Sequence, residues 1–253
     1  MSGIRDDPLV GAVVRELARV WGDRLAAVVV SGSWVAGDAT THSDVDLDCV
    51  VTEGSFRDLA FVAKGRVIDI SGGSEAGWAR VATTPGRAWV LGDWSTWGNV
   101  TLYGDGDVGD RLRAAIDAVP QSRFDDAAAA LVPELASFAG KIASAQERDE
   151  SAAARWAALE AANTAAAIVA LVNRRATGKS WARHLNELLR DADVPAGLGE
   201  SYRILTTGHG SELLDAARRL EDEIVAWLPS RGVAIPAFDR LNDAERLIRR
   251  TTG

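Results

Sequence analysis

Strand-like and helix-like sequence patterns occupy separate halves of this chain of 253 residues. Short β-branched runs occur in the first half, whereas alanine-rich segments with helical periodicity dominate from Asp110 onward. Each half needs an apolar face of its own in order to pack. We therefore predict an α+β fold with two domains, a mixed α/β domain at 1–119 and a helical bundle at 120–253, with a substrate cleft between them.

The apolar spacing predicts the individual elements. A helical stripe covers 8–20, with Pro8 in its first turn. Apolar β-branched runs predict buried strands at 25–33, 45–51 and 66–71, with further strand-like runs at 88–91 and 99–103. Helices are predicted at 56–63, 111–119, 133–146, 152–175, 181–190, 211–228 and 239–249.

Aspartates alternate with apolar residues in the predicted strand at 45–51. Because side chains alternate between the two faces of a strand, Asp44, Asp46 and Asp48 share the face opposite to the apolar residues. Carboxylates two residues apart on a strand lie roughly 7 Å apart at Cα, and their oxygens can converge on hard cations. The strand therefore predicts a magnesium site, in which Asp48 is either a further ligand or a residue that faces solvent.

Small residues and a third acid flank this strand in the sequence. Gly32 and Ser33 end the preceding strand, and such residues let a phosphate approach the backbone and receive hydrogen bonds. Asp69 lies on the strand that we expect to neighbour the acidic one. It could ligate a metal or accept the proton of an attacking hydroxyl, and the alternative is a strand-edge carboxylate that caps a turn.

In combination, these residues resemble the signature of the nucleotidyltransferase superfold. The matching pieces are GS at 32–33, SDVDL at 43–47 and the acid at 69, a core motif of about 40 residues that is specific only as a combination. The helical second half, with LVNRRATGKSWARHL at 171–185, resembles the antibiotic nucleotidyltransferases. Aminoglycoside-modifying members of that group pair such a domain with a helical bundle.

The resemblance implies a role for each matching position. Gly32 and Ser33 would hold the triphosphate of ATP or another nucleoside triphosphate. Asp44 and Asp46 would bind two Mg²⁺ ions, and Asp69 would take the role of the third acid, as metal ligand or base. The reaction would be in-line attack of an acceptor hydroxyl on the α-phosphorus, with release of pyrophosphate.

Two further residues enter through the resemblance. Several aminoglycoside-modifying relatives use a glutamate farther along the chain as the base, and Glu75 is the candidate here, so the base stays open between Asp69 and Glu75. Lys179 would reach a phosphate from the second domain, and the alternative is an ordinary lysine at a helix end.

Two glycine-containing runs partly match other nucleotide-binding motifs. The run at 103–110, YGDGDVGD, matches the dinucleotide fingerprint formally, but its aspartates would face the pyrophosphate and no second parallel strand follows. The run TGKS at 177–180 lacks the first glycine of the ATPase phosphate loop, because Asn173 stands there. We therefore assign neither motif.

The charge balance bears on the partners of the chain. The formal net charge is −8 without any basic block, which disfavours a nucleic acid and suits a cationic acceptor. A single cysteine, Cys49, cannot form an intrachain disulfide, and no run has the length of a signal peptide or membrane span. We expect a soluble cytoplasmic protein that is a monomer or a homodimer.

The predicted function is transfer of a nucleotide, with AMP favoured, to a hydroxyl of a small molecule such as an aminoglycoside-like antibiotic. Two alternatives stay open: a protein or tRNA acceptor, as in toxin-type enzymes, and a non-catalytic nucleotide-binding module. The tryptophan cluster is expected to serve packing, with a stacking wall for a sugar or base as the alternative. Its members are Trp78, Trp89, Trp94 and Trp97.

Overall fold

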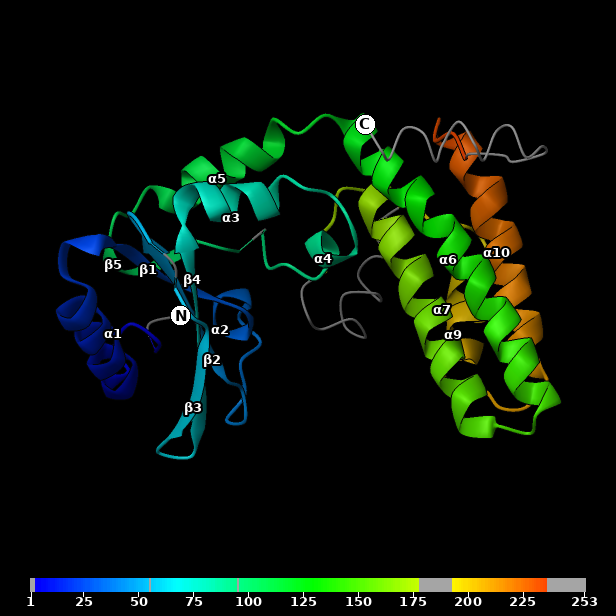
Figure 1. The fold of residues 1–253 in the computed structure, drawn as a ribbon, viewed down its shortest axis with the longest axis horizontal. Coiled ribbons are helices and arrows are strands. Elements are labelled where there is room, and N and C mark those ends of the chain that lie inside the picture. The colour runs from blue at the N-terminus through cyan, green and yellow to red at the C-terminus, as the bar shows by residue number, and fades with distance from the viewer. Residues whose placement is uncertain (1–2, 55, 95, 178–192, 236–253) are drawn as a thin grey trace. The chain divides into compact units, whose positions relative to one another are not determined.

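The computed structural model describes residues 3–54, 56–94, 96–177 and 193–235 (Figure 1). The chain divides into two compact units, of which the first contains 1–123 and 174–190 and the second contains 124–173 and 191–253. The described strands lie in the first unit, and the described part of the second unit is helical. The α+β class is thus confirmed, while the domain boundary at 119/120 stays a prediction.

A mixed sheet forms the centre of the first unit. In the described part of the chain, its strand order is β3-β4-β2-β1-β5. The β2–β4 pair is parallel, and the other neighbouring pairs are antiparallel. The strands are β1 (Leu25–Ser31), β2 (Val45–Val51), β3 (Leu59–Ala63), β4 (Arg66–Ser74) and β5 (Val100–Gly104). The parallel pair sets Asp-bearing strands side by side, which positions the site described below.

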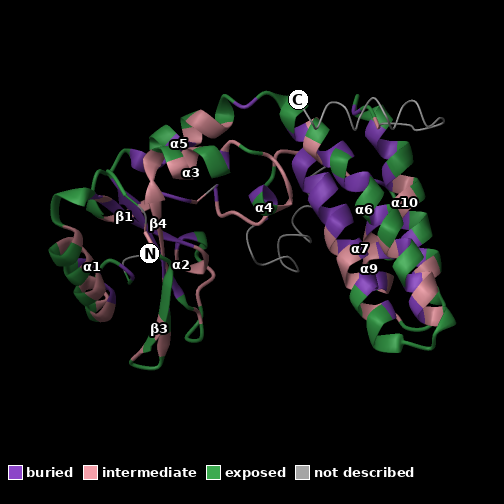
Figure 2. Ribbon diagram, viewed as in Figure 1, coloured by how far each residue is buried: buried purple, intermediate pink, exposed green. Residues whose placement is uncertain are grey.

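Several helices accompany the sheet. The described ones in the first unit are α1 (Pro8–Trp21), α2 (Ser33–Ala36), α3 (Glu75–Ala82), α4 (Arg87–Val90) and α5 (Val108–Asp117), with a 3₁₀ turn at Gly22–Arg24. Helix α1 packs on one face of the sheet, where Val10 and Val14 join the apolar core (Figure 2). The acidic side chains of β2 and β4 lie on the opposite face of the sheet.

Strand β2 shows the predicted alternation of faces. Its core-facing residues are buried against β1, β4 and α1, and they are Val45, Leu47, Cys49 and Val51. Desolvation by this burial, with the nearby Asp48 carboxylate, raises the pKa of the Cys49 thiol to about 12. A thiol held in its protonated form is a poor nucleophile, so Cys49 serves the core.

Asp7 fixes the start of α1. Its carboxylate accepts hydrogen bonds from the backbone N–H groups of Leu9 (2.9 Å) and Val10 (3.1 Å), and it pairs with Arg66 at 2.6 Å. Burial acts to raise the pKa of Asp7, but the bonds from Arg66, Val10 and Leu9 together hold this pKa below its ordinary value of 3.8. The ionised carboxylate is therefore the form that stabilises the fold.

Asp7→Ala is expected to lower the free energy of unfolding by about 1–2 kcal/mol at pH 7, because the helix loses its N-cap. Urea denaturation measures the loss, with the neighbouring exposed Asp6→Ala as control. Since the folded pKa of Asp7 is depressed, its contribution is present above pH 3.8 and is lost as the pH falls through the folded value. A difference between wild type and Asp7→Ala that grows on acidification would contradict this assignment.

The second unit is a bundle of long helices. Its described members are α6 (Gln121–Glu147, in this unit from Phe124), α7 (Ser151–Val172), α9 (Leu198–Thr207) and α10 (Glu212–Ser230). Helices α7, α9 and α10 contact one another, and α7 is the central element (Figures 1 and 2). By length and composition alone α7 could cross a membrane, contrary to the prediction that no run could, but 72% of its most apolar window is buried.

Several predicted elements are corrected by the structure. Residues 59–63 form strand β3 instead of part of a helix at 56–63, because they pair with β4 across the turn at Lys64 and Gly65. The strand predicted at 88–91 is the short helix α4. Helix α6 begins at Gln121, well before the predicted start at Pro133, and α9 was not predicted. The helices predicted at 181–190 and 239–249 lie outside the described residues.

Candidate active site

Strand register brings two of the predicted acids together. Asp46 on β2 is opposite Asp69 on β4 in the parallel pair, and it is opposite Ser31 on β1 in the antiparallel pair. Neighbouring strands are about 4.8 Å apart, so the Asp46 and Asp69 side chains leave the same face of the sheet at adjacent points. The strand that carries Asp69 is thus the neighbour of the acidic strand, as the sequence predicts.

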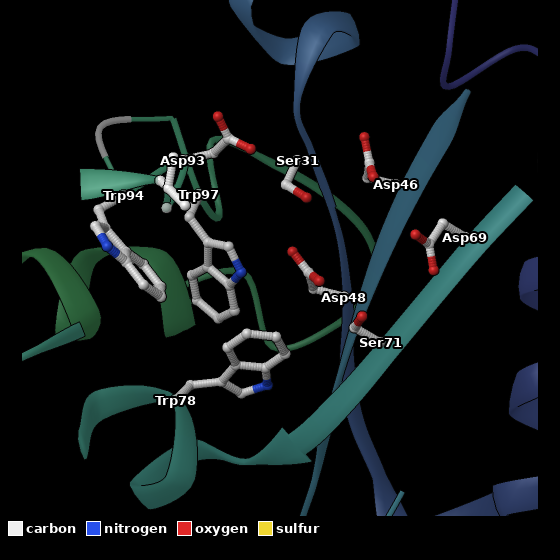
Figure 3. A pocket seen from close by; sticks show the side chains of 11 residues that line it. Ser31, Asp46, Asp48, Asp69, Ser71, Trp78, Asp93, Trp94 and Trp97 are labelled. Atoms are coloured by element: carbon white, nitrogen blue, oxygen red, sulfur yellow. The ribbon is translucent and has the colours of Figure 1, made fainter. Parts of the chain in front are cut away.

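These side chains line a cavity of about 180 Å³ in the first unit (Figure 3). Strand residues form one side of the cavity, and tryptophans and a loop aspartate form the other. The lining residues are Ser31, Asp46, Asp48, Asp69, Ser71, Trp78, Leu91, Gly92, Asp93, Trp94 and Trp97. The cavity therefore combines four carboxylates with an aromatic wall.

Gly32 stands directly beside Asp46. Its backbone has φ 68° and ψ −152°, a region that essentially only glycine adopts. A Cβ atom at this position would also overlap the Oδ2 atom of Asp46. Gly32 thus permits both the sharp turn after β1 and the close approach of the Asp46 carboxylate.

Gly32→Ala is expected to destabilise the protein by about 3 kcal/mol or more, because overlap with Asp46 adds to the backbone strain of about 1–3 kcal/mol that is usual in this region. Gly37→Ala is the matched control, because Gly37 has a left-handed φ of 82° but open space where its Cβ would lie. That control should cost only about 1–2 kcal/mol. Urea denaturation measures the free energy of unfolding of both variants. A loss in Gly32→Ala that is equal to or smaller than the loss in Gly37→Ala would contradict a steric conflict with Asp46.

Ser33 follows as the first residue of α2. Its Oγ atom is buried and has no hydrogen-bond partner among the described residues. A buried hydroxyl normally has a partner, so this atom is available to an oxygen of a bound ligand. The predicted contact of Ser33 with a phosphate stays a prediction, and the orphaned hydroxyl fits it.

Asp44 lies apart from the other predicted acids. It precedes β2, is exposed and does not line the cavity. Its backbone carbonyl accepts a hydrogen bond from Trp34 Nε1 at 2.7 Å, and the Arg66 guanidinium lies 5.4 Å from the centre of the Trp34 ring. The structure therefore fixes the backbone at Asp44, while its predicted role in metal binding remains a prediction.

Two other carboxylates join the cavity. Asp48 is 8% exposed and lines the cavity, which decides against the solvent-facing alternative. Its alternation with Asp46 was the signal in the sequence. Asp93, in the loop after α4, was missed, because nothing in the local pattern distinguishes it from an ordinary loop aspartate.

Glu75 is engaged elsewhere. It accepts hydrogen bonds from Arg111 at 2.6 and 2.9 Å, and Arg111 also pairs with Asp105 at 2.7 Å. The hydrogen bond from Arg111 holds the pKa of Glu75 below its ordinary value. Because Glu75 is also absent from the cavity lining, its geometry does not favour the role of base.

Among the described residues, no group of three or more His, Cys, Asp or Glu side chains is arranged to hold a metal ion. Mg²⁺ commonly takes only one or two protein carboxylates and completes its octahedron with water and substrate phosphates. Asp46 and Asp69 offer such a pair, with the Gly32 turn beside Asp46, so their chemistry fits Mg²⁺ bound with a nucleotide. Lys179 lies outside the described residues.

Comparison with known proteins shows the family of the chain through its second half. Residues 107–234, just over half of the chain, match the family model described as the KNTase C-terminal domain, that of kanamycin nucleotidyltransferase. The chain belongs to this nucleotidyltransferase family. Its resemblance to aminoglycoside nucleotidyltransferases is thereby confirmed.

One solved structure resembles this nucleotidyltransferase over both halves of the chain. A nucleotidyltransferase-like protein from Exiguobacterium sibiricum matches with a TM-score of 0.50 and 12% identity. The match covers 87% of this chain and 75% of that chain, and at this identity it shows the fold alone. No curated protein matches the sequence.

Proposed function

We propose that this chain is a magnesium-dependent nucleotidyltransferase. It transfers a nucleoside monophosphate, with AMP favoured, from the triphosphate to a hydroxyl of a small, cationic acceptor of the aminoglycoside type. Pyrophosphate is the second product. The proposal also includes a cytoplasmic location.

The observation that carries the proposal is the register of β2 and β4. It sets Asp46 directly beside Asp69 on the sheet face that forms the acidic cavity, next to the glycine turn at Gly32. Paired carboxylates beside a phosphate-accessible turn suit transfer of a phosphoryl-type group, in which metal ions neutralise developing charge. The family membership supports the same class of reaction.

Each residue has a distinct task in this proposal. The Gly32 turn and the orphaned Ser33 hydroxyl bind the triphosphate. Asp46 and Asp69 hold the Mg²⁺ ions, which neutralise phosphate charge and lower the pKa of the attacking hydroxyl, with Asp44 a further candidate ligand.

Asp93 is the proposed acceptor of the hydroxyl proton. It faces the strand carboxylates from the loop side of the same cavity. A base must come within hydrogen-bond reach of the proton that it removes, and a residue across the cavity from the metal ligands can meet the incoming acceptor. This role frees Asp69 to act with Asp46 on the metal.

The cavity also suits the proposed acceptor. Beyond the proposed metal ligands, Asp48 and Asp93 can attract an ammonium group, and indole rings add cation–π attraction and an apolar surface for a ring. The net charge of −8 favours approach of a cation in the same way.

Pyrophosphate release tests the proposal. Each nucleoside triphosphate is combined with Mg²⁺ and a panel of aminoglycosides, and mass spectrometry looks for the nucleotidylated acceptor. We expect ATP with at least one aminoglycoside to release pyrophosphate, and EDTA to abolish the release. Absence of turnover with every aminoglycoside would overturn the proposed acceptor, and EDTA-resistant turnover would overturn the metal requirement.

A further inference from the structure

The indole of Trp97 differs from those of its neighbours in the tryptophan cluster. Trp97 is 2% exposed, and its Nε1 atom has no hydrogen-bond partner among the described residues. The other three indoles each donate to a backbone carbonyl: Trp78 to Cys49 at 3.2 Å, Trp89 to Ala82 at 2.7 Å and Trp94 to Trp89 at 2.8 Å. A buried indole N–H without an acceptor is uncommon, so this atom calls for a partner.

The orphaned donor faces the acidic side of the cavity. Trp97 and Asp48 both line the cavity, and Figure 3 shows the indole nitrogen of Trp97 turned toward the Asp48 carboxylate. No hydrogen bond joins them in the structure. The Trp78 ring packs against the Trp97 ring with centroids 5.5 Å apart and an interplanar angle of 44°, which restrains the orientation of the donor.

Donor and acceptor chemistry limits what can lie between these two groups. An indole N–H acts only as a hydrogen-bond donor, and an ionised carboxylate acts only as an acceptor. A hydroxyl group does both, so it can accept from Trp97 and donate to Asp48 at the same time. An ammonium group can donate to Asp48 but has no lone pair for Trp97, whose N–H would stay unsatisfied.

The size of the cavity fits one ring of an acceptor. Its volume is about 180 Å³, and an apolar cavity of about 150 Å³ holds a benzene molecule. A single six-membered ring therefore fits against the indole wall. The ring substituents then face the carboxylates.

We propose that Trp97 and Asp48 bracket one hydroxyl group of the acceptor ring and select it against an amino group at the same ring position. Trp97 is then a specificity-determining residue. This inference rests on the proposed function, because it takes the acceptor as the molecule that enters the cavity.

Trp97→Phe tests the role of the donor. The variant keeps an aromatic ring but removes the N–H together with part of a buried ring, so the Tm should fall through lost packing alone, since no hydrogen bond of the free protein is broken. We expect the KM for the acceptor to rise about tenfold, the worth of one hydrogen bond, with the KM for the triphosphate unchanged. Trp89→Phe is the control, because it leaves the Ala82 carbonyl without its donor and should lower the Tm while the KM for the acceptor stays constant.

A binding experiment gives a readout that needs no turnover. Protein labelled with ¹⁵N at the indole nitrogens is titrated with kanamycin A and kanamycin B, which differ by a hydroxyl in place of an amino group at one ring carbon, and with the other aminoglycosides of the panel. The Trp97 signal is assigned by its loss in Trp97→Phe. We expect it to move downfield on binding of a ring with the bracketed hydroxyl, and to move much less in Asp48→Asn.

The outcomes separate the two proposals. Pyrophosphate release with an unmoved Trp97 signal and an unchanged acceptor KM in Trp97→Phe would overturn the bracket while the proposed function stands. A moved Trp97 signal without any pyrophosphate release would support the bracket and overturn the proposed function. A Trp97 signal that no aminoglycoside moves at saturation would overturn the bracket, since a buried water then satisfies the indole.

Discussion

Asp46→Asn is expected to lower the rate of pyrophosphate release about 10³-fold or more. Metal ions at such a site contribute several kcal/mol of transition-state stabilisation, and each 1.36 kcal/mol corresponds to about tenfold in rate. Asp46 lies opposite Asp69 and beside the Gly32 turn, so it occupies the centre of the proposed metal and phosphate site. An amide keeps the shape of the side chain but carries no charge for the cation.

Asp23→Asn is the matched control for this variant, because Asp23 is an exposed aspartate in the 3₁₀ turn away from the cavity. Both variants should keep the wild-type circular dichroism spectrum. Wild-type turnover by a folded Asp46→Asn protein would contradict its place at the metal.

Asp93→Asn is expected to lower kcat by about 10²-fold, the lower end of the usual contribution of a general base. The KM for the triphosphate should change little, because the proposed phosphate contacts come from Gly32 and Ser33. The fall of the rate at acidic pH should also disappear, since protonation of the base causes that fall. A pH series of steady-state rates measures both effects.

Glu75→Gln is the control that separates the two candidate bases. Glu75 is paired with Arg111 and does not line the cavity, so this variant should keep wild-type kcat. A large loss in Glu75→Gln together with an unchanged Asp93→Asn would reverse the assignment and return Glu75 to the role of base.

The sequence predicts the acidic face well, because that face depends on local alternation. In β2 the apolar residues are buried in the core, and Asp46 and Asp48 lie on the opposite face. The neighbourhood of Asp46 and Asp69 follows from the pairing of two strongly apolar strands. Asp44 precedes the strand, where the alternation no longer fixes the direction of a side chain, and it does not line the cavity.

Strand β3 shows why local spacing can mislead. Leu59 and Phe61 belong to a short apolar run whose spacing alone does not distinguish a helix from a strand. The decisive signal was the turn at Lys64 and Gly65, where both residues have positive φ values of 51° and 76°. Such a two-residue turn joins adjacent antiparallel strands and so makes Leu59–Ala63 the partner of β4.

The far wall of the cavity depends on tertiary packing that the sequence does not display. Asp93 and Trp97 lie in the irregular segment between α4 and β5, which has no periodicity to predict the direction of a side chain. The tryptophan cluster was expected mainly to serve packing. In the structure Trp78, Trp94 and Trp97 line the cavity, whereas Trp89 does not.

Binding of Mn²⁺ in the presence of a non-hydrolysable ATP analogue, followed by electron paramagnetic resonance, tests the central assignment most directly. Mn²⁺ substitutes for Mg²⁺ at oxygen ligands. We expect saturable, nucleotide-dependent binding by wild type and by Asp23→Asn, and strongly weakened binding by Asp46→Asn and Asp69→Asn. Binding of wild-type strength in both Asp46→Asn and Asp69→Asn would contradict the metal site at the junction of β2 and β4.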